Sequence, residues 1–229
     1  MFFYYDPTWW LIIAGMVICL IASGNVSATY RKYNKIENVR GITASEAAER
    51  ILRGAGIHDV RIENTPGELT DHYDPKHKVV RLSDSVYYSA SVAAIGVAAH
   101  ECGHVIQHYG GYVPIRIRNA IVPVVNIGST LSWPLILLGI LFGLTGLVDI
   151  GILLFSLVLI FQIITLPVEF NASNRAIRII GDSGILQQEE IAAARKVLNA
   201  AALTYVAGVI TTALQVLRLV LLFGRRRRD

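Results

Sequence analysis

Two histidines and a glutamate stand close together in the sequence, as His100-Glu101-Cys102-Gly103-His104. On an α-helix, residues four apart lie on one face, so His100 and His104 can direct their imidazoles at one metal ion. Glu101 lies on the same side, about 100° round from His100, where it can reach water on the metal without being a ligand. Catalytic zinc keeps three protein ligands and an open position and lowers the pKa of its water to about 7. A carboxylate beside that water is suited to be the general base for attack on an amide carbonyl.

The helix that would carry this motif, residues 91–109, is apolar nearly all round and is therefore expected to be buried. Burying two histidines and a glutamate is costly unless a partner satisfies them, which favours a metal site over a structural pair of histidines. Cys102 points roughly to the far side of this helix, and we expect it to pack in the core. His108 continues the series but lies another turn along the axis, so we expect a charge effect at the helix C-terminus instead of a ligand.

The composition indicates a membrane protein with a modest polar part. Of the 229 residues 53% are hydrophobic and only 17% are charged, and the mean hydropathy is +0.49. A soluble globular domain is rarely so apolar. The two cysteines, Cys19 and Cys102, lie far apart in sequence, so no disulfide framework is expected, which fits a reducing compartment.

Three apolar segments indicate membrane helices. Residues 1–30 predict an N-terminal transmembrane helix that begins with aromatic residues typical of a membrane interface. Positive charge follows this apolar run instead of preceding it, so a retained helix is expected and not a cleaved signal peptide. Residues 119–167 predict a transmembrane helical hairpin, and residues 200–229 predict an apolar helix with a polybasic tail. The chain should therefore have three or four transmembrane helices.

The polar segment, residues 31–118, is expected to form a small α+β metallopeptidase domain that ends with the helix at 91–109. Thr43 and Glu46 form a capping-box signature that opens an amphipathic helix. Three short strands separated by turns are expected near residues 60–63, 69–73 and 78–82, as a short antiparallel sheet. The edge of this sheet could hold an extended peptide by backbone pairing, or the sheet could simply cover the helix. Three histidines in this turn-rich segment are not expected to be catalytic: His58, His72 and His77.

A third ligand must come from elsewhere in the chain, and Glu169 is the candidate. It lies at the mouth of the second hairpin helix, in a segment (residues 168–199) that predicts a ligand-bearing helix followed by an amphipathic helix. Only the fold can bring it to His104. The spacing alone leaves open whether Glu169 is a ligand or a surface residue.

Several blocks of the sequence carry a resemblance that covers nearly the whole chain. The motif at 100–104, residues 122–129 and 131–134, and residues 166–173 resemble the YugP-type membrane zinc metallopeptidases. The wider pattern, with a Glu on a later helix, is similar to the gluzincins, including the HtpX-type membrane proteases. The resemblance implies that His100, His104 and Glu169 bind Zn²⁺ and that Glu101 is the general base.

The sequence departs from the HtpX-type pattern at Ser173, where those proteins carry an aspartate four residues after the ligand glutamate. A carboxylate that orients a zinc-binding histidine is therefore missing at that position. Asn171, Asn174 or another group would have to take this role. Arg175 could steady Glu169 or a carbonyl oxyanion, and a solvated helix face explains it equally well.

The distribution of basic residues predicts which side of the membrane the polar part faces. Lysines and arginines near the first three spans favour a catalytic part on the cytoplasmic side of a bacterial-type cell membrane. A spanning fourth helix would then place four arginines outside. Either the rule is broken, or the last helix does not cross and its tail meets anionic lipid. No nucleic-acid partner is expected, because no base-reading fold is visible.

Together these features predict a mainly helical integral membrane zinc endopeptidase whose partners are the lipid bilayer and a peptide or membrane-protein substrate. Partner subunits and a homo-oligomer remain open. One rival is a non-catalytic zinc membrane protein acting as an adaptor or assembly factor, and the intact Glu101 disfavours it because structural zinc needs no base. The other is a transporter with Asn126 or Gln162 on its path, but the densest polar chemistry lies at the helix ends.

Overall fold

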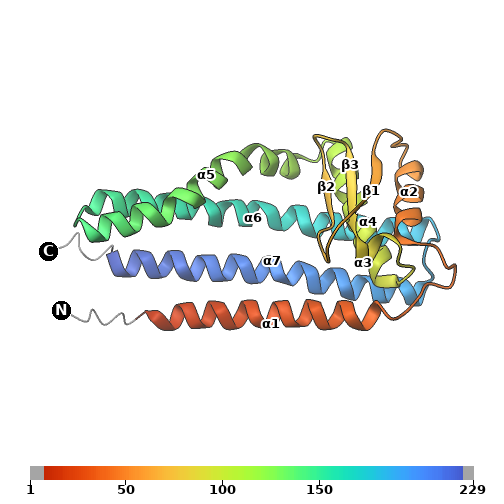
Figure 1. Ribbon diagram of the computed structural model, residues 1–229, viewed down its shortest axis with the longest axis horizontal. Helices are drawn as coiled ribbons and strands as arrows, with labels where there is room; N and C mark the ends of the chain where they lie inside the picture. The colour runs from red at the N-terminus through yellow and green to blue at the C-terminus, as the bar shows by residue number, and fades with distance from the viewer. Residues whose placement is uncertain (1–7, 224–229) are drawn as a thin grey trace. The chain divides into compact units, whose positions relative to one another are not determined.

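The computed structural model describes residues 8–223 (Figure 1), and these are mostly helical. The aromatic residues at positions 2–5 and the arginines at 225–228 lie outside the described residues. In chain order the elements are α1 (Trp9–Tyr33), α2 (Ala44–Gly54), β1 (Arg61–Thr65), β2 (His72–Asp74), β3 (Val79–Ser83), α3 (Asp84–Tyr87), α4 (Val92–Tyr109), α5 (Val113–Leu141), α6 (Thr145–Asp182) and α7 (Gln188–Phe223). The prediction of a mainly helical protein with a small sheet is confirmed.

The described chain has four helices long and apolar enough to cross a membrane, namely α1, α5, α6 and α7. The chain divides into two compact units. The first, called the membrane unit here, comprises Met1–Ser23, Ile117–Leu166 and Thr204–Asp229. The second, called the sheet unit, comprises Gly24–Arg116 and Pro167–Leu203. Each of the four long helices contributes residues to both units, and α6 changes from one to the other at Pro167.

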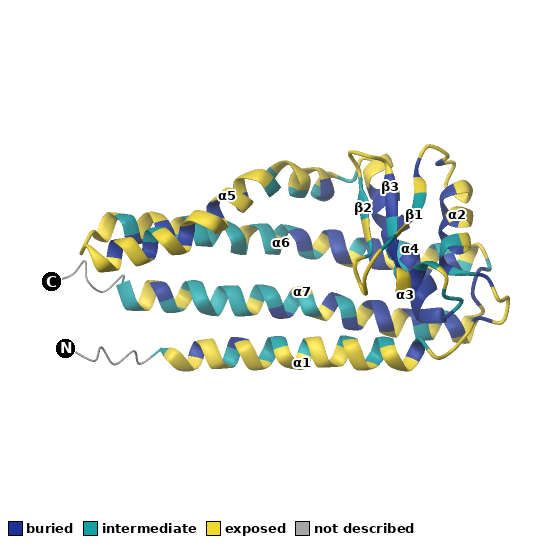
Figure 2. Cartoon of the chain, in the orientation of Figure 1, coloured by how far each residue is buried: buried dark blue, intermediate teal, exposed yellow. Residues whose placement is uncertain are grey.

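Large apolar side chains cover the outside of the helices in the membrane unit. Leu20, Ile21 and Leu153 are 66%, 67% and 64% exposed, and Figure 2 shows exposed positions along all four long helices. Apolar surface on this scale is stable in hydrocarbon, where every backbone group must be bonded within the helix itself. The chain is therefore an integral membrane protein, as the composition predicted.

The sheet is mixed, so the prediction of an antiparallel sheet was wrong. The strand order is β1-β3-β2, with β1 parallel to β3 and β2 antiparallel to β3. The turn after Asp74 makes a hairpin of β2 and β3, but residues 66–71 are long enough to carry the chain past one strand position. Strand β3 holds the buried residues Val79, Val80 and Leu82, so it takes the centre, where both of its backbone edges are paired. The more polar β1 and β2 lie at the edges.

The core of the sheet unit forms where α2 and β3 pack with α4. The capping box at the start of α2 is present: the Thr43 hydroxyl accepts from the backbone N–H of Glu46, and the Glu46 carboxylate accepts from the backbone N–H of Thr43. Helix α2 buries Ala47, Ala48 and Ile51 against α4, which is itself buried on nearly every face (Figure 2). The prediction of a buried helix at 91–109 is confirmed, with Ser91 as its N-cap.

Helix α4 lies unusually close to α6 at Gly103. A Cβ atom at this position would be 2.7 Å from the carbonyl oxygen of Ala172, and backbone cannot rotate away as a side chain can. At Gly96 the neighbour is the Ala194 methyl group, 3.3 Å from such a Cβ. Small residues therefore set how near α6 and α7 can come to α4, and Gly103 leaves less room for a Cβ atom than Gly96 does.

We expect Gly103→Ala to destabilise the protein by about 1–3 kcal/mol, because the added methyl group must push α4 and α6 apart. Gly54→Ala is the matched control, since a Cβ there meets nothing within 4 Å. In the helix it should be neutral or stabilising by up to about 1 kcal/mol. The measurement is thermal unfolding of both variants in detergent, and equal midpoints would contradict the close contact.

Candidate metal centre

Three donor side chains from two helices converge in the sheet unit. His100 and His104 stand on α4 and Glu169 on α6, and their ligand atoms all lie within 4.8 Å of one another. The Nε2 atoms of His100 and His104 lie 3.3 Å and 3.7 Å from Oε2 of Glu169. Two donors about 2.1 Å from one tetrahedral zinc ion are about 3.4 Å apart, so the spacing fits a single ion. The donor set, two imidazoles and a carboxylate, also suits zinc.

The other ring nitrogen of each histidine is held by a neighbour. Nδ1 of His100 lies 3.1 Å from the hydroxyl of Ser173, and Nδ1 of His104 lies 3.0 Å from Oε1 of Gln107. A histidine ligand with its Nδ1–H bonded in this way keeps Nε2 free of a proton and available to the metal. The two rings lie nearly perpendicular, at an interplanar angle of 85°.

Gln107 is fully buried, and its partners determine how its amide is oriented. Its Nε2 donates to the carbonyl oxygen of Val168 (2.8 Å) and to Oδ1 of Asn171 (3.0 Å). A carbonyl can only accept, so the NH₂ group of Gln107 must face Val168 and its oxygen must face His104. That oxygen in turn requires the hydrogen of His104 to be on Nδ1. The carbonyl of Val168 therefore fixes the orientation of the Gln107 amide, and this amide fixes the tautomer of His104 that carries its hydrogen on Nδ1.

Asn171 extends this chain to Arg175. Nε of Arg175 donates to Oδ1 of Asn171 at 2.7 Å, and because a guanidinium cannot accept, the amide oxygen of Asn171 must face it. The guanidinium also lies over the ring of Tyr112, 5.9 Å from the ring centre. Arg175 thus supports the amide that holds Gln107. The hydrogen-bond partner of the Arg175 guanidinium here is the neutral amide of Asn171.

The remaining residues of the motif on α4 are buried. Glu101 is 8% exposed, close enough for its charge to act on both Cys102 and His104. Burial raises the pKa of the Cys102 thiol, whose Sγ faces the carbonyl of Ala48, so it stays protonated in the core as expected. Burial alone would lower the pKa of His104, but the hydrogen bond to Glu169 and the charges of Glu101 and Glu169 raise it above its ordinary value. Protons therefore compete with a metal here.

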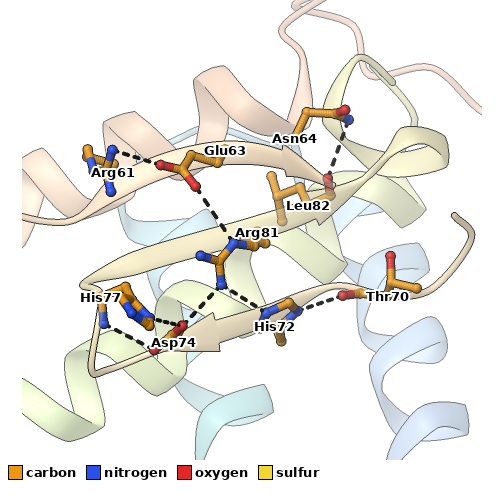
Figure 3. A network of polar contacts seen from close by, with 9 residues as sticks. All are labelled: Arg61, Glu63, Asn64, Thr70, His72, Asp74, His77, Arg81 and Leu82. Atoms are coloured by element: carbon orange, nitrogen blue, oxygen red, sulfur yellow. Dashed lines mark hydrogen bonds and ion pairs between the residues drawn. The ribbon is translucent and has the colours of Figure 1, made fainter. Parts of the chain in front are cut away.

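Asn174 and the histidines that were not expected to bind the metal lie outside the donor group. Asn174 is exposed on α6, next to Ser173 but without its histidine contact. His108 is not in the donor group, and its Nδ1 lies 3.1 Å from the hydroxyl of Tyr73. His72 and His77 belong to a polar network on the outer face of the sheet (Figure 3), in which hydrogen bonds from His77 hold the pKa of Asp74 well below its usual range.

Two residues near the centre were not anticipated from the sequence. The only sequence signal for Gln107 is its position three residues after His104, on a neighbouring part of the same helix face. The sequence pattern indicates a missing carboxylate at Ser173, whereas the Ser173 hydroxyl itself reaches His100. Asn171, one of the alternatives for orienting a histidine, bonds to Gln107, and Gln107 in turn contacts His104.

Comparison with known proteins shows the family to which this chain belongs. A family model described as "Putative neutral zinc metallopeptidase" matches residues 8–224. The "Putative membrane protease YugP" of Bacillus subtilis (strain 168) is 46% identical over 219 residues, which cover 96% of this chain and 97% of that protein. No solved structure gives a significant match. The expectation that the cofactor is Zn²⁺ is confirmed by this family and by the donor group at His100, His104 and Glu169.

We expect Gln107→Leu to weaken zinc binding by about 10–100-fold, because the Nδ1–H of His104 and the carbonyl of Val168 lose a buried partner. Gln187→Leu, the same change at an exposed position, should leave the affinity unchanged. Competition with a fluorescent zinc chelator measures both. Equal affinities for the two variants would remove the role given to Gln107.

A second expectation concerns Ser173, whose hydroxyl is the partner of His100. Ser173→Ala should lower the zinc affinity by about tenfold while leaving the unfolding midpoint of the metal-free protein nearly unchanged. The control is Ser183→Ala, directly after the end of α6, where the hydroxyl donates to backbone carbonyls of that helix. If Ser183→Ala lowers the affinity as much, the effect belongs to helix α6 and not to the contact with His100.

Proposed function

This chain belongs to the neutral zinc metallopeptidase family, and we propose that it is a membrane-embedded endopeptidase that hydrolyses peptide bonds of membrane or membrane-proximal proteins. The observation that carries the proposal is the convergence of His100, His104 and Glu169 beside a buried Glu101. His100 and His104 would hold zinc through Nε2, and Glu169 through its carboxylate. When bound, zinc polarises a carbonyl as a Lewis acid and makes water a stronger acid.

Glu101 is assigned the proton transfers of the reaction. Its carboxylate takes a proton from the water molecule whose oxygen forms a bond to the carbonyl carbon of the substrate. It then gives that proton to the nitrogen of the scissile bond, so that the C–N bond breaks with a neutral amine as leaving group. Because Glu101 is one residue from His100 on the same helix, the base keeps a constant position relative to the metal ligands. Its burial keeps bulk water from competing for the proton.

The edge of the sheet offers a place for an extended substrate. Strand β2 lies at one edge, packs against α4, and pairs with β3 on one side only. A peptide added along its outer edge would bond to the backbone of residues 72–74 in the way that added strands do. We assign β2 to substrate binding because it is the edge strand that contacts the helix with His100 and His104. Because β2 is only three residues long, backbone pairing along it would impose little preference on the substrate sequence.

The membrane helices favour a substrate that lies in or near the bilayer. The helix with Glu169 is the same helix whose first part belongs to the membrane unit. Basic residues beside the apolar segments favour a cytoplasmic position for the sheet unit. With α7 as a fourth span, the C-terminus would lie outside, and the polybasic tail would be an exception to the positive-inside rule.

A non-catalytic zinc protein remains the alternative, with the same three ligands used for structure. Structural zinc sites are closed by four protein ligands, while the donor group among the described residues has three. A buried carboxylate next to the ligands also has a cost that a structural site need not bear. Both observations favour an enzyme.

The deciding experiment compares zinc content and casein cleavage for the wild type, Glu101→Gln and Glu169→Ala in detergent. We expect Glu101→Gln to keep about one zinc per chain and lose activity by about 10²–10⁴-fold, because it retains the shape but cannot accept a proton. Glu169→Ala should lose most of its zinc. Glu49→Gln, a change at an exposed residue of α2, should alter neither quantity.

The outcomes separate the two functions. If the wild type holds zinc and Glu101→Gln cleaves casein at the same rate, the protease activity comes from elsewhere and the assignment fails. If the wild type and Glu101→Gln both hold zinc and neither cleaves casein or an unfolded membrane protein, the structural alternative is favoured.

A further inference from the structure

A separate cavity of about 360 Å³ lies in the membrane unit, within the usual range of ligand sites. It is formed by α5, α6 and α7, and its lining is mixed. Phe161 and Gly208 are its apolar part. The polar part is unusual for a bundle of membrane helices and consists of Arg118, Gln162, Thr165, Thr204 and Tyr205.

The charge of this lining favours an anion. Arg118 is its charged group, and none of the described residues that line the cavity is acidic. Arg116, two residues earlier on α5, is exposed, whereas Arg118 is half-buried in the cavity wall. An arginine within a membrane helix is costly and usually faces a partner or a functional cavity. Arginine also matches phosphate well, because its planar fork can donate two hydrogen bonds at once.

The lining also holds an acceptor. Oε1 of Gln162 is buried and has no hydrogen-bond partner among the described residues. The hydroxyl of Thr165 donates to the carbonyl of Phe161 in its own helix, so that proton is already used. A ligand that matches this lining therefore carries an anionic group that faces Arg118 and a hydroxyl that donates to Gln162.

The position of the lining residues along the three helices indicates at which level of the membrane the cavity lies. Arg118 precedes the long apolar part of α5, and Thr165 ends the apolar part of α6, just before Pro167. Thr204 and Tyr205 stand near the start of the apolar part of α7. On all three helices the lining is thus at the end of the hydrophobic stretch, where phospholipid headgroups lie.

We propose that this cavity binds the headgroup of an anionic phospholipid that carries a free hydroxyl, of the phosphatidylglycerol type. The phosphate accepts hydrogen bonds from Arg118, and a headgroup hydroxyl donates to Oε1 of Gln162. Free phosphate could also accept hydrogen bonds from Arg118. The position of the cavity at the level of the lipid headgroups and the apolar side chain of Phe161 in its lining favour a lipid. The site is distinct from the centre at His100, His104 and Glu169, and its existence does not depend on catalysis.

The test is thermal unfolding of the full-length protein in detergent with added phosphatidylglycerol, phosphatidylcholine, or glycerol 3-phosphate. We expect phosphatidylglycerol to raise the unfolding midpoint and the other two to leave it nearly unchanged. In Arg118→Gln the phosphatidylglycerol concentration needed for half of this effect should rise about tenfold or more, as the loss of charge-assisted bonds predicts. Arg116→Gln, the matched control, should respond as the wild type does.

Two further variants cover the case in which Arg118→Gln does not fold. Arg118→Lys keeps the charge and loses the fork, so it should still prefer phosphatidylglycerol but bind it more weakly. Gln162→Leu should respond equally to phosphatidylglycerol and to phosphatidic acid, which lacks the glycerol hydroxyls, whereas the wild type should prefer phosphatidylglycerol.

Three results would overturn the proposal. An equal response of Arg116→Gln and Arg118→Gln would assign the effect to general surface charge. Stabilisation by glycerol 3-phosphate as large as that by phosphatidylglycerol would make the ligand a soluble phosphate. Stabilisation by phosphatidylcholine to the same extent would remove the recognition of an anion.

Discussion

The close contact between α4 and α6 at Gly103 is the constraint on which the metal centre depends. The carbonyl of Ala172 occupies the space where any other residue would place its Cβ. Gly103 lies between the two histidines of the motif, and Ala172 lies one turn of helix after Glu169. The separation of the two helices at this contact is therefore also the separation of the imidazoles from the carboxylate. Protein interiors are too closely packed to absorb a change here without moving these three side chains.

Buried polar groups around the histidines complete what the backbone contact begins. Gln107, Asn171 and Ser173 are neutral. The amide orientations of Gln107 and Asn171 are fixed by the carbonyl of Val168 and by Arg175, and the Ser173 hydroxyl contacts Nδ1 of His100. Neutral partners avoid the desolvation cost of a third buried carboxylate beside Glu101 and Glu169. The arrangement also makes the positions of His100 and His104 dependent on α6, because Ser173, Asn171 and the carbonyl of Val168 all belong to it.

Helix α6 therefore serves two environments. Before Pro167 it is apolar and belongs to the membrane unit, and after Pro167 it carries Glu169, Asn171 and Ser173 in the sheet unit. Proline removes one backbone donor and weakens the helix locally, yet the helix continues through it. A single helix of this kind joins the Glu169 carboxylate of the sheet unit to a segment apolar enough to cross a membrane.

The sequence alone determined those features that depend on local pattern. The helix of His100 and His104, the capping box at Thr43, and the apolar lengths of the membrane helices are all periodic or short-range signals, and the structure agrees with them. Only the tertiary structure decided which residues far apart in the chain meet. It placed β3 between β1 and β2, brought Ser173 to His100, and put Gln107 between His104 and Asn171. Such contacts depend on the packing distance between α4 and α6, and a backbone contact 2.7 Å from an absent Cβ has no counterpart in sequence spacing.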